Sequence, residues 1–231
     1  MVICYHAVSR TWDHPLAIPP EQLLRQVRAL RRFAPLHVTF DDAYANIELV
    51  LPELTAMGAP ITVFVCTDLA DRGGAPLRVS ELGEPTPDDI AGLETMSWDQ
   101  LRTLVTRGIG VASHTASHAH LIDLPDEDVR RELLESKQRI EAELDRPCLE
   151  FAYPYGEHDA RVRALAAEAG YERAHALEVA APGPYGLARL GLHRRDGVPR
   201  ALLKALTLGP RARRYGRART PVTQPVSGQL S

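Results

Sequence analysis

The sequence predicts an α/β fold, specifically a distorted or incomplete (β/α) barrel of about seven strands in a single domain. Two observations predict it. Short apolar runs alternate with segments of helical periodicity, which is typical of βαβ units and a largely parallel sheet. The chain has 231 residues, of which 45% are hydrophobic and 25% charged. This composition is typical of a globular protein with one hydrophobic core.

The apolar runs indicate strands, in chain order, at residues 2–5, 36–40, 61–65, 109–113, 149–153, 171–174 and 187–192. Segments with apolar side chains at helical spacing lie between them and indicate helices at residues 20–33, 44–57, 98–107, 126–144, 159–169 and 199–206. Strands that alternate with helices in this way favour a parallel barrel.

Two segments fall outside this alternation. Residues 71–95 are rich in glycine, proline and acidic side chains without a clear period, so we expect a long excursion after the third strand that could roof a substrate groove. Residues 209–231 carry five arginines and no acidic residue, and they end in a stretch rich in proline, serine and glutamine. We therefore expect a folded domain at residues 1–208 and a basic, disordered tail at residues 209–231.

Bulk properties argue against several classes of protein. The net charge of −3 does not favour binding to nucleic acid or to an anionic membrane surface. The cysteines Cys4, Cys66 and Cys148 show no CxxC spacing and lie in apolar surroundings, which indicates buried free thiols. The chain as given shows neither a signal-peptide pattern nor an apolar run of membrane-spanning length, so a cytoplasmic location is expected.

The most informative segment carries two adjacent carboxylates, Asp41 and Asp42, directly after an apolar strand and before a helix. In a (β/α) barrel the carboxyl ends of the strands form the active-site face, so both side chains are candidates for catalysis or metal binding. The alternative is that one of them caps the helix that starts near Tyr44.

A second segment, again just past an apolar strand, places His114 and His118 four residues apart. On a helical turn this spacing brings both imidazoles to one face, although such pairs also occur by chance. Two histidines and a carboxylate together supply the three protein ligands of a catalytic zinc site and leave open positions for water and substrate.

These segments resemble motifs of the polysaccharide deacetylases of carbohydrate esterase family 4, the NodB-homology domain. The first motif, TFDD, stands here as Thr39-Phe40-Asp41-Asp42, and the second, SHTxxH, as Ser113-His114-Thr115-Ala116-Ser117-His118. The third stands as Phe151-Ala152-Tyr153-Pro154-Tyr155-Gly156. The resemblance covers roughly residues 2–196.

The resemblance implies a role for each matching residue. Asp41 would be the general base, and Asp42, His114 and His118 would bind a divalent metal. That metal would most simply be Zn²⁺, although Co²⁺ and Ni²⁺ bind similar sites. The backbone N–H of Tyr155 would stabilise the oxyanion of the tetrahedral intermediate.

The sequence departs from the family pattern at two places. Ala152 stands where many members have an arginine that orients the base, and the fourth motif, an acidic pair ending in tryptophan, has no match after Tyr171. The fifth motif, LxxH, matches Leu190-Gly191-Leu192-His193 and implies that His193 is the general acid. His6, at the end of the first strand, is an alternative proton donor, or else a hydrogen-bonded core histidine.

The missing arginine leads to a further prediction, which concerns Arg189 on the last strand. The base must stay ionised beside a cation, and a guanidinium can hold one carboxylate with two hydrogen bonds. Side chains alternate along a strand, so we place Arg189 in the inward set, where it supplies the positive charge that Ala152 cannot. The alternative is an exposed arginine in a solvated salt bridge.

The predicted function is metal-dependent hydrolysis of an N-acetyl amide, with an N-acetylated amino sugar, glycan or glycoconjugate as substrate. Two alternatives remain open: a catalytically silent carbohydrate-binding domain of the same fold, and a hydrolase of non-carbohydrate amides. The expected partner is thus the small-molecule or carbohydrate substrate, not nucleic acid, and the sequence makes no prediction of oligomeric state.

Overall fold

The structure is a computed structural model, and it describes residues 1–77, 93–177 and 181–215. Seven parallel strands form a closed barrel in the order β1 (Val2–Tyr5), β4 (His37–Phe40), β5 (Ile61–Val65), β6 (Gly110–Ser113), β7 (Glu150–Ala152), β8 (Arg173–Leu177) and β9 (Leu187–Gly191). The last strand pairs with the first, with Ile3 opposite Leu190. The predicted barrel is therefore confirmed, and its ring of strands is complete.

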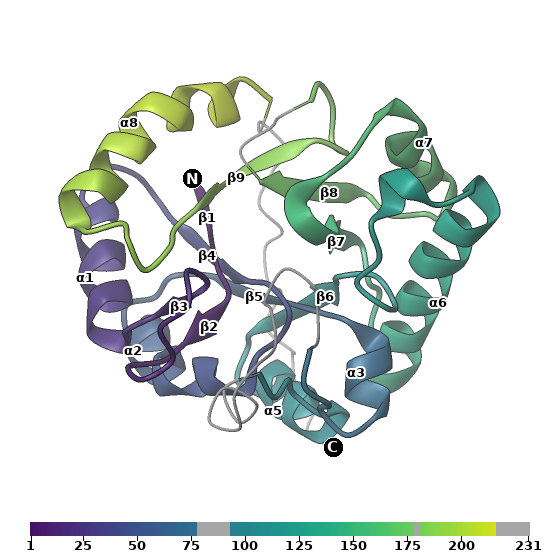
Figure 1. The fold of residues 1–231 in the computed structure, drawn as a ribbon, viewed down its shortest axis with the longest axis horizontal. Coiled ribbons are helices and arrows are strands. Elements are labelled where there is room, and N and C mark those ends of the chain that lie inside the picture. Colours follow the sequence, from purple (N-terminus) through teal and green to yellow (C-terminus); the bar gives the residue numbers. More distant parts are fainter. Residues whose placement is uncertain (78–92, 178–180, 216–231) are drawn as a thin grey trace, which may run out of the picture.

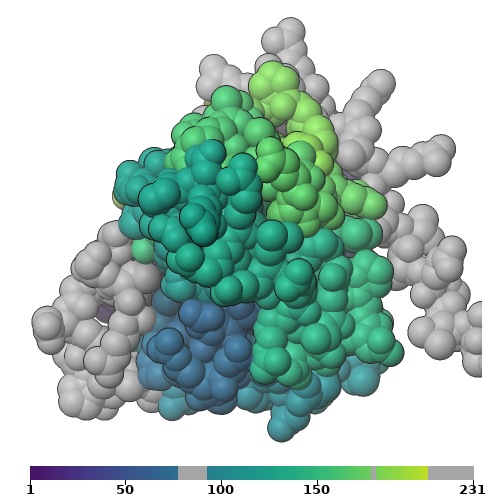
Figure 2. Space-filling view, turned by 90° about the vertical axis from the view of Figure 1, so that its right-hand side faces the viewer, coloured from purple at the N-terminus to yellow at the C-terminus, as the bar shows by residue number. Residues whose placement is uncertain are grey.

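Helices surround this barrel (Figure 1). They are α1 (Pro20–Leu30), α2 (Leu51–Ala56), α3 (Thr67–Asp71), α5 (Trp98–Thr106), α6 (Asp126–Leu144), α7 (Ala160–Glu168) and α8 (Val198–Tyr215), with short 3-10 turns η1 (Ala45–Leu49), η3 (Leu121–Asp123) and η4 (Pro154–Gly156). Figure 2 shows the side of the molecule on which α6 and α7 lie, covered by the teal and green part of the chain. None of the helices in the described residues is both long enough and apolar enough to cross a membrane.

The helices bury one face each, as their periodicity predicts. In α6 the buried side chains are Val129, Leu133, Ser136, Ile140 and Leu144, at spacings of three or four residues. The α5 helix begins with a capping box in which Ser97 and Gln100 satisfy each other's backbone N–H groups. Sequence periodicity thus located these helices because it follows directly from one-sided burial.

Most element ends shift by one to three residues from the predicted ranges, and three of the differences have a clear physical reason. The helix expected at 44–57 is split into η1 and α2, and Pro52 in the first turn of α2 explains the break because proline has no N–H to continue a preceding helix. The strand expected at 171–174 begins only at Arg173. Tyr171 packs instead against Phe151, with ring centroids 4.8 Å apart, and its hydroxyl donates to the Leu133 carbonyl of α6.

The third difference concerns the C-terminal helix. The α8 helix was expected to end at residue 206 but runs to Tyr215, through Gly209 where the predicted tail begins. Leucine, alanine and arginine within the extension favour a helix, whereas Gly209 and Pro210 oppose it. The remainder of the predicted tail, 216–231, and most of the predicted excursion, 78–92, lie outside the described residues.

A small separate sheet of β2 (Ala7–Val8) and β3 (Ala17–Ile18) was not predicted, because strands of two residues are too short to show any periodicity.

The interior of the barrel combines small and large side chains. Phe64, Ala112 and Ala152 form a buried apolar cluster, separate from the main core between strands and helices. Arg189 is the largest fully buried side chain among the described residues, and its guanidinium carbon lies 5.0 Å from the centre of the Phe64 ring. Because alanine leaves more room than the arginine expected at position 152, the interior has space for an arginine that comes from β9.

Candidate active site

The residues singled out from the sequence gather at the carboxyl ends of the strands. Asp41 and Asp42 follow β4, His114 follows β6, Tyr155 follows β7, and His6 follows β1. This is the face on which (β/α) barrels carry their active sites. Neither aspartate caps a helix, because η1 begins at Ala45, with Tyr44 at its N-cap position and no side-chain cap.

The loops that carry these residues have an unusual backbone conformation. Asp42, Thr115, His118 and Tyr155 have positive φ angles of 66°, 68°, 66° and 58°. Non-glycine residues rarely adopt this left-handed region, and such positions cluster at functional sites where the surrounding structure fixes them. The strained conformations thus lie in the same loops as the predicted ligands.

The three predicted metal ligands converge. Asp42 Oδ1 lies 3.4 Å from His114 Nε2 and 3.3 Å from His118 Nε2, and all three side chains are buried. A tetrahedral ion with ligand bonds of about 2.0–2.2 Å separates its ligand atoms by about 3.3–3.6 Å. The spacing therefore fits a divalent metal of this size.

Hydrogen bonding prepares His114 for this role. Its Nδ1 lies 2.9 Å from the Ala152 carbonyl oxygen, which can only accept, so Nδ1 carries the hydrogen and Nε2 presents its lone pair to the cluster. Asp42 Oδ1 has no hydrogen-bond partner although it is buried. A buried carboxylate oxygen without a donor is costly, and a bound cation would satisfy it.

The electrostatics of the cluster also favour a cation. Burial lowers the pKa of His114, but the carboxylates of Asp41 and Asp42 outweigh burial and raise it above its usual value. Burial raises the pKa of Asp42, but the adjacent imidazoles of His114 and His118 outweigh burial and hold the pKa well below its usual range. Asp42 is therefore ionised, and the site attracts positive charge.

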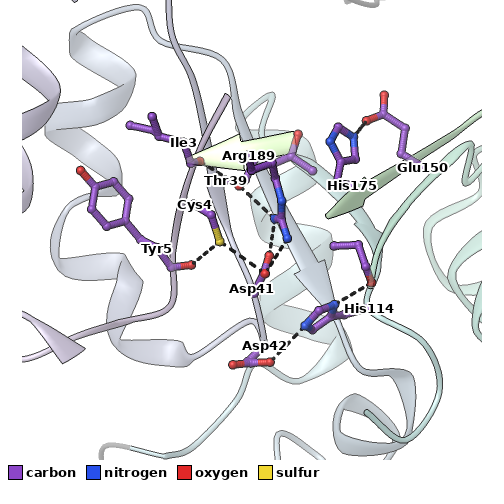
Figure 3. A network of polar contacts seen from close by, with 12 residues as sticks. Ile3, Cys4, Tyr5, Thr39, Asp41, Asp42, His114, Glu150, His175 and Arg189 are labelled. Atoms are coloured by element: carbon purple, nitrogen blue, oxygen red, sulfur yellow. Dashed lines mark hydrogen bonds and ion pairs between the residues drawn. The ribbon is translucent and has the colours of Figure 1, made fainter. Parts of the chain in front are cut away.

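Asp41 is held by Arg189, as Figure 3 shows. Arg189 Nη1 donates to Asp41 Oδ1 at 2.6 Å and Nη2 donates to Oδ2 at 2.7 Å, with both side chains almost completely buried. Nη1 also donates to Thr39 Oγ1 at 3.1 Å. The inward orientation of Arg189 and its contact with Asp41 are thus confirmed, and the alternative of an exposed salt bridge is wrong.

This contact sets the charge of Asp41. Burial raises the pKa of the Asp41 carboxyl, but the charge and hydrogen bonds of Arg189 outweigh burial and lower the pKa to about 2. Asp41 is therefore ionised throughout the neutral range, and the bidentate geometry fixes the plane of its carboxylate.

Tyr155 forms one wall beside the ligand cluster. Its ring meets the ring of His118 edge-on, with centroids 4.6 Å apart, and stacks on His120 at 3.6 Å. His120 Nδ1 in turn lies 3.0 Å from Glu157 Oε2. The residue whose backbone was predicted to stabilise an oxyanion is therefore next to a predicted metal ligand.

The two candidate proton donors occupy different places. A ring nitrogen of His6, a carboxylate oxygen of Asp41 and Cys4 Sγ all lie within 4.8 Å of one another, so His6 is part of the site. His193 follows β9, the strand that pairs with β1. Its ring approaches Gly191, its backbone N–H donates to Asp196 Oδ2, and burial followed by the charge of His6 lowers its pKa to about 4.

The Cys4, His6 and Asp41 group also has ligand atoms close enough to bind a metal. Both Asp41 oxygens, however, already accept hydrogen bonds from the positively charged guanidinium of Arg189. A second cation there would be repelled by Arg189, so this group does not suit a metal.

One residue that organises the site was not predicted. Glu132 on α6 accepts hydrogen bonds from the backbone N–H groups of Ala116 and Ser117, at 3.0 and 2.9 Å, and from the Ser117 hydroxyl. It thereby fixes the loop between His114 and His118. Nothing in the sequence marks Glu132, since its partners lie about 15 residues away and it looks like any acidic residue on a helix surface.

Comparisons with known proteins agree with this geometry. A family model described as polysaccharide deacetylase matches residues 31–174, which is more than half of the chain. A curated Bacillus subtilis (strain 168) protein named for this family, YxkH, is 23% identical over 158 residues. That match covers 66% of this chain and 50% of YxkH, so the chain spans about half the length of this relative.

Solved structures share the fold. The Streptococcus pyogenes deacetylase PplD, solved with acetate, has a TM-score of 0.70 at 17% identity, with 88% of this chain and 96% of that chain covered. A de-N-acetylase from Aggregatibacter actinomycetemcomitans has a TM-score of 0.68 at 15% identity, with coverages of 88% and 98%. The matched family model spans all three sequence motifs, and it shows that the chain belongs to the polysaccharide deacetylase family.

Proposed function

We propose that this protein is a metal-dependent deacetylase that hydrolyses an N-acetyl amide on an amino sugar, a glycan or a glycoconjugate. One observation carries the proposal: the convergent Asp42, His114 and His118 cluster adjoins Asp41, a carboxylate that Arg189 keeps ionised. Membership of the polysaccharide deacetylase family supports both the reaction and the class of substrate.

Asp42, His114 and His118 would hold the metal. Two imidazoles and one carboxylate form the ligand set of catalytic zinc sites, so we propose Zn²⁺, with Co²⁺ and Ni²⁺ as ions that the same ligands accept. When bound, such an ion lowers the pKa of water and polarises an acyl carbonyl. His114 is already held in the required tautomer by the Ala152 carbonyl.

Asp41 would act as the general base. Its carboxylate is ionised and lies outside the proposed ligand set, so it is available to take a proton from the attacking water. Arg189 holds it in one orientation through two hydrogen bonds and carries a permanent charge. We therefore propose that Arg189 takes over the positioning role of the arginine that Ala152 replaces.

The tetrahedral intermediate needs a hydrogen-bond donor for its oxyanion, and we propose the backbone N–H of Tyr155. The left-handed conformation at this residue and the contact of its ring with His118 support the assignment. The stacked rings of Tyr155 and His120 would form the wall against which the acetyl group and its sugar pack.

The leaving amine requires a proton, and two histidines are candidates. His193 is the family-based candidate; its ring lies against Gly191 and its backbone N–H donates to Asp196. His6 lies within 4.8 Å of the Asp41 carboxylate, and this proximity favours it as the group that delivers the proton. Comparing the kcat of His6→Asn and His193→Asn separates the two, since only the true donor should slow the release of the amine.

A substrate panel tests the proposed function. Acetate release would be measured for acetylated amino sugars in free, nucleotide-linked, lipid-linked and polymeric form, and for an acetylated lysine peptide, before and after metal removal by a chelator. Metal-dependent release from at least one amino sugar is expected. Release only from the peptide would support the non-carbohydrate alternative. Metal binding without any release would support the silent domain, against which the Arg189 contact with Asp41 already weighs.

A further inference from the structure

Besides Arg189, one more side chain contacts the proposed base Asp41, and it is the thiol of Cys4. Cys4 lies on β1 inside the barrel, is fully buried, and places its Sγ 3.3 Å from Asp41 Oδ2 (Figure 3). The sequence alone indicated only a buried free thiol, because nothing in it shows that β1 and β4 run side by side with Cys4 opposite Thr39.

The Cys4 thiol acts as a donor in this contact. Burial raises the pKa of the thiol well above its usual value, against the opposing charge of Arg189, so the sulfur keeps its hydrogen. Two oxygens compete for that hydrogen, Asp41 Oδ2 at 3.3 Å and the Tyr5 carbonyl at 3.5 Å. The carboxylate is charged and nearer, and charge-assisted hydrogen bonds are the stronger ones.

Counting acceptor positions shows what the thiol does to the carboxylate. Each carboxylate oxygen offers about two lone-pair positions. Oδ2 accepts from Arg189 Nη2 and from Cys4 Sγ, whereas Oδ1 accepts from Arg189 Nη1 alone. Among the contacts of the described residues, Oδ1 therefore keeps one open lone-pair position and Oδ2 keeps none.

We propose that Cys4 is a positioning residue for the base: its thiol fills the second acceptor position of Asp41 Oδ2, so that Oδ1 is the oxygen that takes the proton from water. This inference rests on the proposed function, in which Asp41 is the base. Arg189 fixes the plane of the carboxylate, and Cys4 makes its two oxygens unequal within that plane.

Steady-state kinetics test the role of Cys4. In Cys4→Ala, kcat should fall about fivefold, which corresponds to about 1 kcal/mol, while KM and the bound metal stay unchanged. Cys4→Ser keeps an O–H donor and should recover most of the lost rate. Cys148→Ala is the matched control, because it removes a buried thiol whose contact is with the Glu150 carbonyl, not Asp41, and it should leave kcat unchanged.

The infrared S–H stretching band tests the contact without any catalysis. The S–H band of Cys4 is the one absent from Cys4→Ala, and that of Cys148 is the one absent from Cys148→Ala. The Cys4 band should lie at the lower frequency, because donation to a carboxylate weakens the S–H bond. In Asp41→Asn the Cys4 band should move to higher frequency.

Three results would overturn the inference: a Cys4→Ala enzyme as fast as Cys148→Ala, a Cys4→Ser enzyme as slow as Cys4→Ala, or a Cys4 band that does not respond to Asp41→Asn. If the unmodified protein releases no acetate from any substrate, both the proposed function and the positioning role of Cys4 in catalysis are refuted. The infrared bands then still decide whether the thiol donates to Asp41.

Discussion

Replacing Arg189 by methionine should slow turnover on the order of a hundredfold. It should also shift the acidic decline of the rate to a higher pH than in the unmodified enzyme. Methionine fills a similar volume and can pack on Phe64, but it provides no donor and no charge. The Asp41 carboxylate then keeps the burial that raises its pKa and loses the partner that lowers it to about 2. General base catalysis contributes about 10²–10⁴ to rates, so a misplaced and partly protonated base accounts for the expected loss.

The sign of the pH effect follows from these two pKa values. With Arg189 present, Asp41 is ionised at every pH above about 2, so its protonation does not limit the rate at pH 5–8. Without Arg189, burial places the pKa above the usual value of 3.8, and the rate should decline as the pH falls toward that raised pKa. A lysine at position 189 should restore only part of the rate, because an ammonium cannot bind both oxygens in one plane.

Stability changes as well and must be measured first. Removing one partner of a buried ion pair costs about 3–5 kcal/mol, which lowers the Tm of a domain of this size by about 10 °C. The assay is the kcat against pH, run well below the Tm of the variant. Arg173→Met is the control, since Arg173 pairs with Glu150 at 2.6 Å on neighbouring strands. If the kcat of Arg189→Met declined at the same acidic pH as the kcat of the Arg173→Met control, the reasoning would be refuted.

Two further predictions concern residues around the site. In Glu132→Gln the loop between His114 and His118 loses its carboxylate acceptor. Metal titration should show an affinity reduced about 10–100-fold with the fold retained. An unchanged affinity would mean that the loop keeps its conformation without Glu132. Burial raises the pKa of Glu150, but its hydrogen bond with His175 and the charges of His175 and Arg173 lower it to about 2. Its stabilising effect, on the order of 2 kcal/mol, is therefore present above about pH 4.5 and lost as the pH falls toward 2, so Glu150→Gln should flatten this part of a denaturation curve measured against pH.

The sequence predicted the fold and the proposed ligands because both depend on local patterns. Strands of a parallel barrel are short apolar runs, and the residues that follow them share one face, so Asp42 and His114 could be brought together without coordinates. The same alternation placed Arg189 inside the barrel. That prediction needed only the inward direction of the Arg189 side chain and the absence of an arginine at position 152.

The sequence could not predict contacts that depend on tertiary packing. Glu132 reaches its loop from a helix, and Cys4 reaches Asp41 across a pair of strands whose register no local pattern specifies. The late start of β8 has the same cause, because Tyr171 packs between α6 and the barrel before the strand begins. The choice between His6 and His193 also required the barrel to be closed, since both follow strands that are neighbours only through that closure.

The central claim is that Asp42, His114 and His118 hold a metal while Asp41 acts as a base beside it. The most direct measurement is the metal content and acetate release of Asp41→Asn and His114→Ala, prepared in parallel. We expect Asp41→Asn to retain one divalent metal per chain with turnover reduced by about 10²–10⁴, and His114→Ala to lose both metal and activity. Loss of the metal from Asp41→Asn, or turnover near that of the unmodified enzyme in either variant, would contradict the account.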